Sequence, residues 1–99
     1  MNKPLTLSTP ELQAGDVVLT YGMRVRLSPE PRIYQNRGTV YAWNGTVENL
    51  DEVKADGFVP MSFLSEGHWV DGKGWVYEVT GRWVIQGNDL ATWAVMRSA

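Results

Sequence analysis

The stretch from Trp75 to Arg97 constrains the fold more than any other, because it holds three of the five tryptophans and its first half alternates side-chain types. A period of two is typical of a half-buried strand pair. A three-residue loop over residues 79–81, with its glycine in the left-handed conformation, sets Trp75 opposite Ile85. Burial should enforce this register, since a one-residue slip would bring charges onto the aromatic face. The residues assigned to the core are Trp75, Tyr77, Trp83, Ile85 and Trp93.

Two further strands are predicted near the start of the chain. Residues 17–20 form a β-branched apolar run, and Gly22 separates this run from residues 23–27. In the second run the apolar residues share one face while Arg24 and Arg26 share the other. One face is therefore expected to pack in the core and the other to face water. The segment Ser28–Pro31 must leave the sheet, because its two prolines cannot donate hydrogen bonds to a neighbouring strand.

A second hairpin is expected over residues 39–50, after a long loop that runs through Arg32 and Arg37 to Gly38. Its turn would be Asn44-Gly45, because both residues accept the positive φ of a type I′ turn. Pairing around that turn sets Trp43 opposite Thr46 and leaves Trp43 near the surface.

The rest of the chain gives shorter signals. Residues 49–57 read as one or two helical turns that start at a possible Asp51 cap and stop at a glycine. Residues 58–64 can be a strand that its proline restricts to an edge or a bulge. Residues 65–74, with three glycines, read as a flexible loop or wide turn. Near the C-terminal end of the sequence we favour a turn at residues 88–91 followed by a strand at residues 92–97.

These elements predict an all-β fold, with five to seven short strands and at most one short helical turn. We expect a single domain, a five-stranded SH3-like barrel over residues 15–99, with an OB-like barrel as the alternative. Residues 1–14 carry two prolines among Ser and Thr, so they are expected to form a flexible arm.

Three sequence segments carry a family resemblance: GDVV followed by GMRVRL near the start, VPMSFL in the middle and WVIQGNDLATWAV near the end. Together they resemble a family of small, uncharacterised proteins of actinobacterial phages and their hosts, over most of the chain after Gly15. The resemblance implies a phage or bacterial source and a cytoplasmic location. It implies no activity and no catalytic residues.

Composition narrows the class of protein. A net charge of −2 and a pI near 5.2 argue against coating nucleic acid through bulk electrostatics. The absence of cysteine excludes disulfides and thiolate metal sites and favours a reducing compartment. No signal peptide or membrane span is expected, so the prediction is a cytoplasmic protein without membrane contact.

Enzymatic chemistry finds little support in the sequence. A facial metal triad of Glu66, His68 and Asp71 is conceivable, but its glycine-rich setting lacks the rigidity that a metal site needs. The chain has one histidine, so only one imidazole could act as the base for a nucleophile. Glycine-rich nucleotide-binding motifs are missing from the sequence. We therefore predict a non-enzyme without metal or cofactor.

Charge is distributed unevenly along the chain. Residues 23–43 hold four arginines and one acid, a local charge of +3, and residues 44–71 hold six acids and one lysine, a local charge of −5. Opposed patches suit docking to a charged partner. Equally, the two segments can satisfy one another across the fold or face water separately, since exposed ion pairs contribute only ~0–1 kcal/mol each.

These features together predict a module that binds a protein partner. The arginines would steer and pair, and exposed aromatic residues would supply contact area, as in protein-binding hot spots. One alternative is a nucleic-acid-binding barrel, in which the arginines contact phosphates and Tyr34 joins the aromatic residues in stacking on bases. Another is a structural, self-assembling component. The candidate binding residues are Arg24, Arg26, Arg32, Arg37, Tyr41, Trp43 and Trp69.

Overall fold

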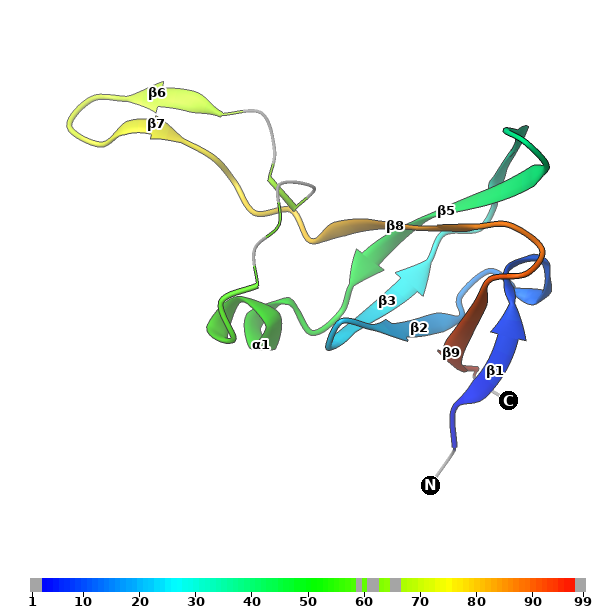
Figure 1. The fold of residues 1–99 in the computed structure, drawn as a ribbon. Coiled ribbons are helices and arrows are strands. Elements are labelled where there is room, and N and C mark those ends of the chain that lie inside the picture. Colours follow the sequence, from blue (N-terminus) through cyan, green and yellow to red (C-terminus); the bar gives the residue numbers. More distant parts are fainter. Residues whose placement is uncertain (1–2, 59, 61–62, 65–66, 98–99) are drawn as a thin grey trace.

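The computed structural model describes residues 3–58, 60, 63–64 and 67–97, which are built largely of β-strands (Figure 1). These residues include a 3-10 turn at Thr9–Glu11 and the helix α1 at Leu50–Ala55. The strands are β1 Leu5–Ser8, β2 Val17–Thr20, β3 Met23–Leu27, β4 Arg32–Gln35, β5 Thr39–Val47, β6 His68–Val70, β7 Gly74–Val76, β8 Arg82–Gly87 and β9 Thr92–Met96.

The main sheet is antiparallel and follows the order β1-β9-β2-β3-β5, with β4 and β8 both paired to β5. A separate two-stranded sheet consists of β6 and β7. The prediction of an all-β fold is confirmed. A closed barrel is not, because within the described residues no pairing joins β1 at one end of the sheet to β4 or β8 at the other.

The two strands predicted near the start of the chain are confirmed as β2 and β3. The apolar face of β3 is buried, with Met23, Val25 and Leu27 exposed by 1%, 0% and 4%, while its two arginines are exposed. The predicted turn before β9 is also confirmed. Asn88 shapes it through its Oδ1 atom, which accepts hydrogen bonds from the backbone amides of Leu90 and Ala91 at 2.9 and 3.0 Å.

The hairpin predicted at Asn44-Gly45 is wrong, because β5 runs without interruption through both residues. Gly45 lies between β3 and β8, opposite Leu27 on one side and Trp83 on the other. A Cβ atom there would lie 2.3 Å from Cγ1 of Val25, so glycine serves close packing rather than a turn. The turn into β5 instead spans residues 36–38, and the long loop predicted before it contains β4.

The hairpin predicted between residues 75–77 and 83–85 is also wrong. Trp75 pairs with Trp69 in the β6–β7 hairpin, and β8 pairs with β5, which sets Trp43 opposite Ile85. Gly81 does adopt the predicted positive φ, at 70°, but there it directs the chain into β8. The alternation indicated strands correctly, whereas the partners were fixed by packing against β5. The loop expected at residues 65–74 contains β6, and Ser65 and Glu66 lie outside the described residues.

The helical turns predicted at residues 49–57 are present as α1. The helix ends before Gly57, which adopts a φ of 83°. The residue before the helix is Asn49, not the predicted Asp51. Asn49 is 6% exposed; its side-chain amide accepts a hydrogen bond from the Arg24 amide and donates one to the Gly22 carbonyl. Of the strand expected at residues 58–64, residues 59, 61 and 62 lie outside the described residues. The described ones do not form a strand, although Leu64 makes an isolated antiparallel bridge with Val79.

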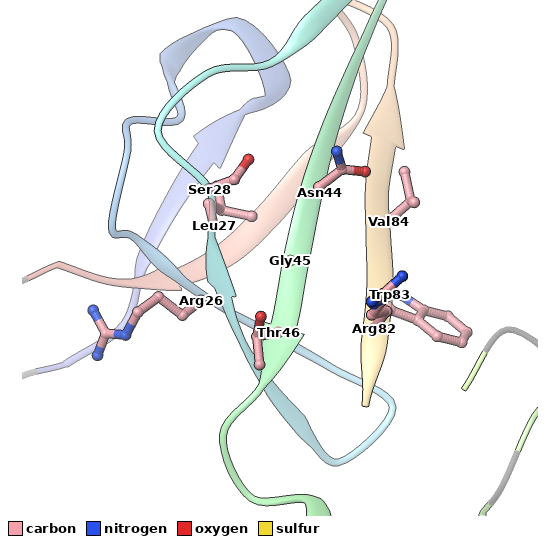
Figure 2. A pocket seen from close by; sticks show the side chains of 9 residues that line it. All are labelled: Arg26, Leu27, Ser28, Asn44, Gly45, Thr46, Arg82, Trp83 and Val84. Carbon is pink, nitrogen blue, oxygen red and sulfur yellow. The ribbon is translucent and has the colours of Figure 1, made fainter. Parts of the chain in front are cut away.

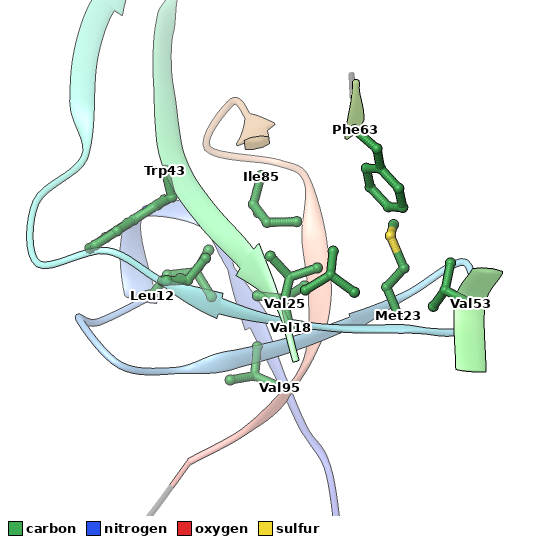
Figure 3. Close-up of a cluster of buried hydrophobic side chains, with 11 residues drawn as sticks. Leu12, Val18, Met23, Val25, Trp43, Val53, Phe63, Ile85 and Val95 are labelled. Carbon is green, nitrogen blue, oxygen red and sulfur yellow. The ribbon is translucent and has the colours of Figure 1, made fainter. Parts of the chain in front are cut away.

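The core lies on the inner side of the curved sheet, with Val53 of α1 at one end of the cluster (Figure 3). Ile85 is fully buried as predicted, and Trp83 and Trp93 are partly buried against the core. The assignments of Trp75 and Tyr77 are wrong, because they are 55% and 48% exposed on or beside the β6–β7 hairpin. Buried members of the core cluster are Leu12, Val18, Met23, Val25, Leu27, Trp43, Val47, Val53, Phe63, Ile85 and Val95.

The segment expected to be a flexible arm is part of the sheet, since β1 pairs along its length with β9. Thr9 follows β1 and is fully buried, where its hydroxyl accepts a hydrogen bond from Nε1 of Trp93 at 3.0 Å. Leu12 lies in the core at 5% exposure. The prolines did not exclude order here because they flank β1, and Pro10 lies inside the 3-10 turn, where a missing amide is tolerated.

An ion pair joins this N-terminal segment to the end of β9. The carboxylate of Asp16, only 3% exposed, accepts hydrogen bonds from Nε and Nη2 of Arg97 at 2.9 and 2.8 Å and from the Gln13 amide at 2.8 Å. The bonds from the Arg97 guanidinium hold the pKa of Asp16 below its ordinary value.

Replacing Asp16 by asparagine is expected to lower the free energy of unfolding by about 1–2 kcal/mol near neutral pH, because Arg97 loses its charged partner. A depressed carboxylate pKa in the folded state stabilises the fold above the unfolded-state value, about 3.9, and this contribution disappears as the pH falls through the folded-state pKa. Urea titrations from neutral pH into acid should therefore show that the difference in unfolding free energy between wild type and Asp16→Asn disappears below about pH 4. A difference in unfolding free energy that stays constant in acid would contradict a stabilising role for the Asp16 carboxylate.

Candidate functional site

The outer face of the sheet, opposite the core, carries a hollow of about 540 Å³, which we call the sheet groove (Figure 2). Three strands build it. The pairing register places Arg26 of β3 beside Thr46 of β5, and Thr46 beside Arg82 of β8. In the next row Asn44 lies beside Val84, and its carbonyl accepts a hydrogen bond from the Ser28 amide at 2.8 Å. The groove residues are Arg26, Leu27, Ser28, Asn44, Gly45, Thr46, Arg82, Trp83 and Val84.

The two arginines of the sheet groove are in different states. Arg26 donates hydrogen bonds from Nε to the carboxylate of Glu48 and from Nη1 to the Gly15 carbonyl, the latter at 2.9 Å. Arg82 is exposed and forms no ion pair with any acid in the described part of the chain. A ligand at the groove would therefore meet one guanidinium that is already neutralised and one that is free.

The four predicted arginines do not form one unpaired patch. Nη1 of Arg24 lies 3.8 Å from Oε2 of Glu52 in α1, and Arg26 pairs with Glu48, so both arginines contact the acidic segment. Their side chains are still 48% and 50% exposed, so the pairs lie at the surface. The alternative in which the charged segments satisfy one another holds for these two arginines.

The other two predicted arginines are exposed and unpaired among the described residues, but they lie apart. Arg32 of β4 is opposite Ala42, one row beyond the Asn44 row, on the same face as the sheet groove. Arg37 occupies the turn into β5 with a φ of 56°, away from the groove. Sequence reasoning missed Arg82 because its place beside Thr46 depends on the long-range pairing of β8 with β5.

The predicted aromatic residues also separate. Trp43, expected near the surface, is 5% exposed in the core, because Asn44-Gly45 makes no turn. Its Nε1 atom has no hydrogen-bond partner among the described residues. Tyr41 is partly buried, and this burial together with a hydrogen bond to Asp89 raises the pKa of its hydroxyl. Neither residue offers the open contact surface that the sequence reading assigned to it.

Comparison of the chain with protein-family models, with curated proteins and with solved structures gives no match.

A second surface is the β6–β7 hairpin, residues 68–76, which extends from the rest of the fold (Figure 1). We call it the tryptophan hairpin. Trp69 and Trp75 lie directly opposite each other in its register and are 66% and 55% exposed. Nε1 of Trp69 donates a hydrogen bond to Asp71 at 3.1 Å, and the Trp75 indole covers Gly67, where a Cβ atom would lie 2.1 Å from Nε1. Both indoles are thus held in place at the surface.

The described residues offer little for catalysis or metal binding. His68 is exposed on β6, and Glu66 of the conceivable triad lies outside the described residues. Over residues 3–58, 60, 63–64 and 67–97, no three His, Cys, Asp or Glu side chains gather as metal ligands would. In the same residues, neither α1 nor the 3-10 turn has the length and apolar character needed to cross a bilayer.

Proposed function

We propose that the chain is a non-enzymatic β module that binds another protein through the tryptophan hairpin. The observation that carries this proposal is the exposed cross-strand pair of Trp69 and Trp75. Neither residue belongs to the core cluster or packs against it. Two large apolar side chains held in water outside the core give the fold little stability, so a binding role is the better account of their exposure.

The physical chemistry of tryptophan supports contact with a protein. Each indole can bury ~150–250 Å² and retain a polar N–H at its edge. Tryptophan is enriched among interface residues whose truncation costs ~2 kcal/mol or more, and such residues cluster in the centre of an interface. A rigid pair loses little conformational entropy on binding, because the hydrogen bond to Asp71 and the contact with Gly67 already orient the rings.

The topology supports an SH3-like arrangement for the supporting sheet. The order β9-β2-β3-β5-β8 places the last strand beside the first and runs the middle strands in sequence, as in SH3-like barrels, but open. Under this assignment, α1 and the tryptophan hairpin form an insertion between β5 and β8. Insertions on a rigid sheet are common places for binding residues. The family resemblance supports a phage or bacterial source and a cytoplasmic location.

The test is recovery of a partner from lysate of the source organism by immobilised wild type and by a double variant, Trp69→Ser with Trp75→Ser. Wild type should retain a defined protein, and the double variant should lose at least about tenfold of it, a loss of ~1.4 kcal/mol or more. The thermal midpoint should be unchanged, because neither indole contacts the core. The matched control is Leu90→Ser, which removes an 87% exposed apolar side chain from the turn before β9.

Equal recovery by wild type and the double variant would refute the proposal. Disappearance of the captured protein after nuclease treatment would favour the nucleic-acid alternative instead. Large oligomers of wild type on a sizing column, reduced to monomer in the double variant, would favour self-assembly through the same indoles.

Binding of nucleic acid is the second candidate, supported by the unpaired Arg32 and Arg82 on the outer face together with the exposed Tyr34 of β4. It is weakened by the pairing of Arg24 and Arg26 with acids. If it is correct, affinity for single-stranded or double-stranded DNA should fall steeply between low and physiological salt. Absent or salt-independent binding removes this candidate.

A further inference from the structure

The sheet groove and the row beyond it form a surface with a local excess of positive charge. Arg82 borders the groove on β8, and Arg32 lies on the same face on β4, on the other side of β5. Neither pairs with an acid among the described residues, and Glu48, the acid nearest the groove in the register, is occupied by Arg26. Two guanidinium groups are thus available to an anionic ligand.

The floor between these arginines is low and carries three small polar side chains beside the apolar Val84. The hydroxyl of Thr46 and the amide of Asn44 are exposed and form no hydrogen bond with other described residues, and Ser28 Oγ makes only a 3.3 Å contact with the Glu30 carbonyl. These groups supply donors and acceptors suited to the main chain of an extended peptide. Their small size leaves the hollow of about 540 Å³.

The aromatic content of this face distinguishes a peptide from a nucleic acid. Proteins that bind single strands stack successive bases on several aromatic rings. At the outward positions of β3, β4, β5 and β8, Tyr34 is the one aromatic residue; Trp43 and Trp83 belong to the opposite, inward positions. Two free positive charges and a hydrogen-bonding floor match a lightly charged ligand better than a phosphate backbone.

We propose that the sheet groove binds an extended, acidic peptide segment of a protein partner. One carboxylate pairs with the fork of Arg82, a geometry that allows two parallel hydrogen bonds. A second carboxylate meets Arg32. The two arginines lie at rows four residues apart along β5, between Thr46 and Ala42, which is about 13 Å along the strand direction for a segment that runs parallel to β5. The segment therefore carries acids about four positions apart. This site is separate from the tryptophan hairpin and does not depend on it.

The test uses a short capped peptide of alternating threonine and valine, with two glutamates four positions apart, titrated into ¹⁵N-labelled protein and followed by NMR. Saturable shifts are expected at the amides of residues 26–28, 44–46 and 82–84. Arg82→Gln should weaken the affinity about tenfold, equivalent to ~1.4 kcal/mol, and high salt should weaken it further. Arg82 is exposed and unpaired among the described residues, so this variant should fold normally.

Two controls decide the outcome. Arg37→Gln removes an exposed arginine outside the groove and should leave the affinity unchanged. The same peptide with glutamine in place of glutamate should bind at least about tenfold more weakly. The proposal is overturned if the glutamate peptide gives no saturable shifts at the groove, if the glutamine peptide binds equally, or if an oligothymidylate binds the same amides more tightly than the glutamate peptide.

Discussion

Replacing Ile85 by alanine is expected to lower the free energy of unfolding by about 2–5 kcal/mol, the largest effect we predict for a single substitution. Ile85 is fully buried in the middle of β8 and lies opposite Trp43 of β5. Truncation removes apolar contact and leaves a cavity that the paired strands cannot fill without breaking register. In a domain of this size the loss is a large share of the total stability, which is about 5–15 kcal/mol.

The matched control is Val84→Ala, one residue earlier on the same strand. Val84 faces the sheet groove and is 44% exposed, so the expected change is within about 0.5 kcal/mol. Chemical denaturation of the two variants and wild type gives both values, and the slope against denaturant should be unchanged. Similar losses from the two substitutions would mean that β8 does not present Ile85 inward and Val84 outward.

Gly45→Ala is expected to destabilise the fold by about 1–3 kcal/mol, because the new methyl group has no room. Its Cβ would lie 2.3 Å from Cγ1 of Val25 and 2.9 Å from the carbonyl oxygen of Trp83. Val25 is itself fully buried and Trp83 contributes main chain, so neither can move away without disturbing the sheet. Thermal or urea unfolding measures the loss.

The Asn44→Thr substitution distinguishes a continuous β5 from the hairpin that the Asn-Gly pair suggests. In a continuous strand, Asn44 is exposed between two paired strands, so threonine should be neutral or stabilising by a few tenths of a kcal/mol. In a type I′ turn the same change would place a β-branched residue at a positive φ, at a cost of about 1–3 kcal/mol. A substantial loss of stability in Asn44→Thr would show that β5 is interrupted.

Sequence patterns predicted the strands best where one face is buried along the whole element. Alternation in residues 23–27 gave β3 and its inward face correctly, since each apolar residue meets core and each arginine meets water. The turn before β9 was predictable because Asn88 bonds to nearby backbone. Such signals are local, so distant parts of the chain do not alter them.

Partners of strands could not be predicted from local signals. Asn44-Gly45 satisfies the rules for a turn, yet Gly45 is needed where β3 and β8 approach β5 from both sides. Trp75 follows the pattern of a core strand, yet it pairs with Trp69 at the surface. The same limit applies to the candidate sites, since Arg82 joins the sheet groove only through β8–β5 pairing, and Arg24 and Arg26 are neutralised by residues more than twenty positions away.

We propose that Trp69 and Trp75, rather than Trp43, are the indoles that contact a partner. Fluorine NMR of protein labelled with fluorotryptophan, with the signals of the five residues assigned by single Trp→Phe replacements, tests this claim directly. A soluble paramagnetic agent should broaden the signals of Trp69 and Trp75 and spare that of Trp43, which is 5% exposed. A broadened Trp43 signal, or protected Trp69 and Trp75 signals in the monomer, would contradict the account.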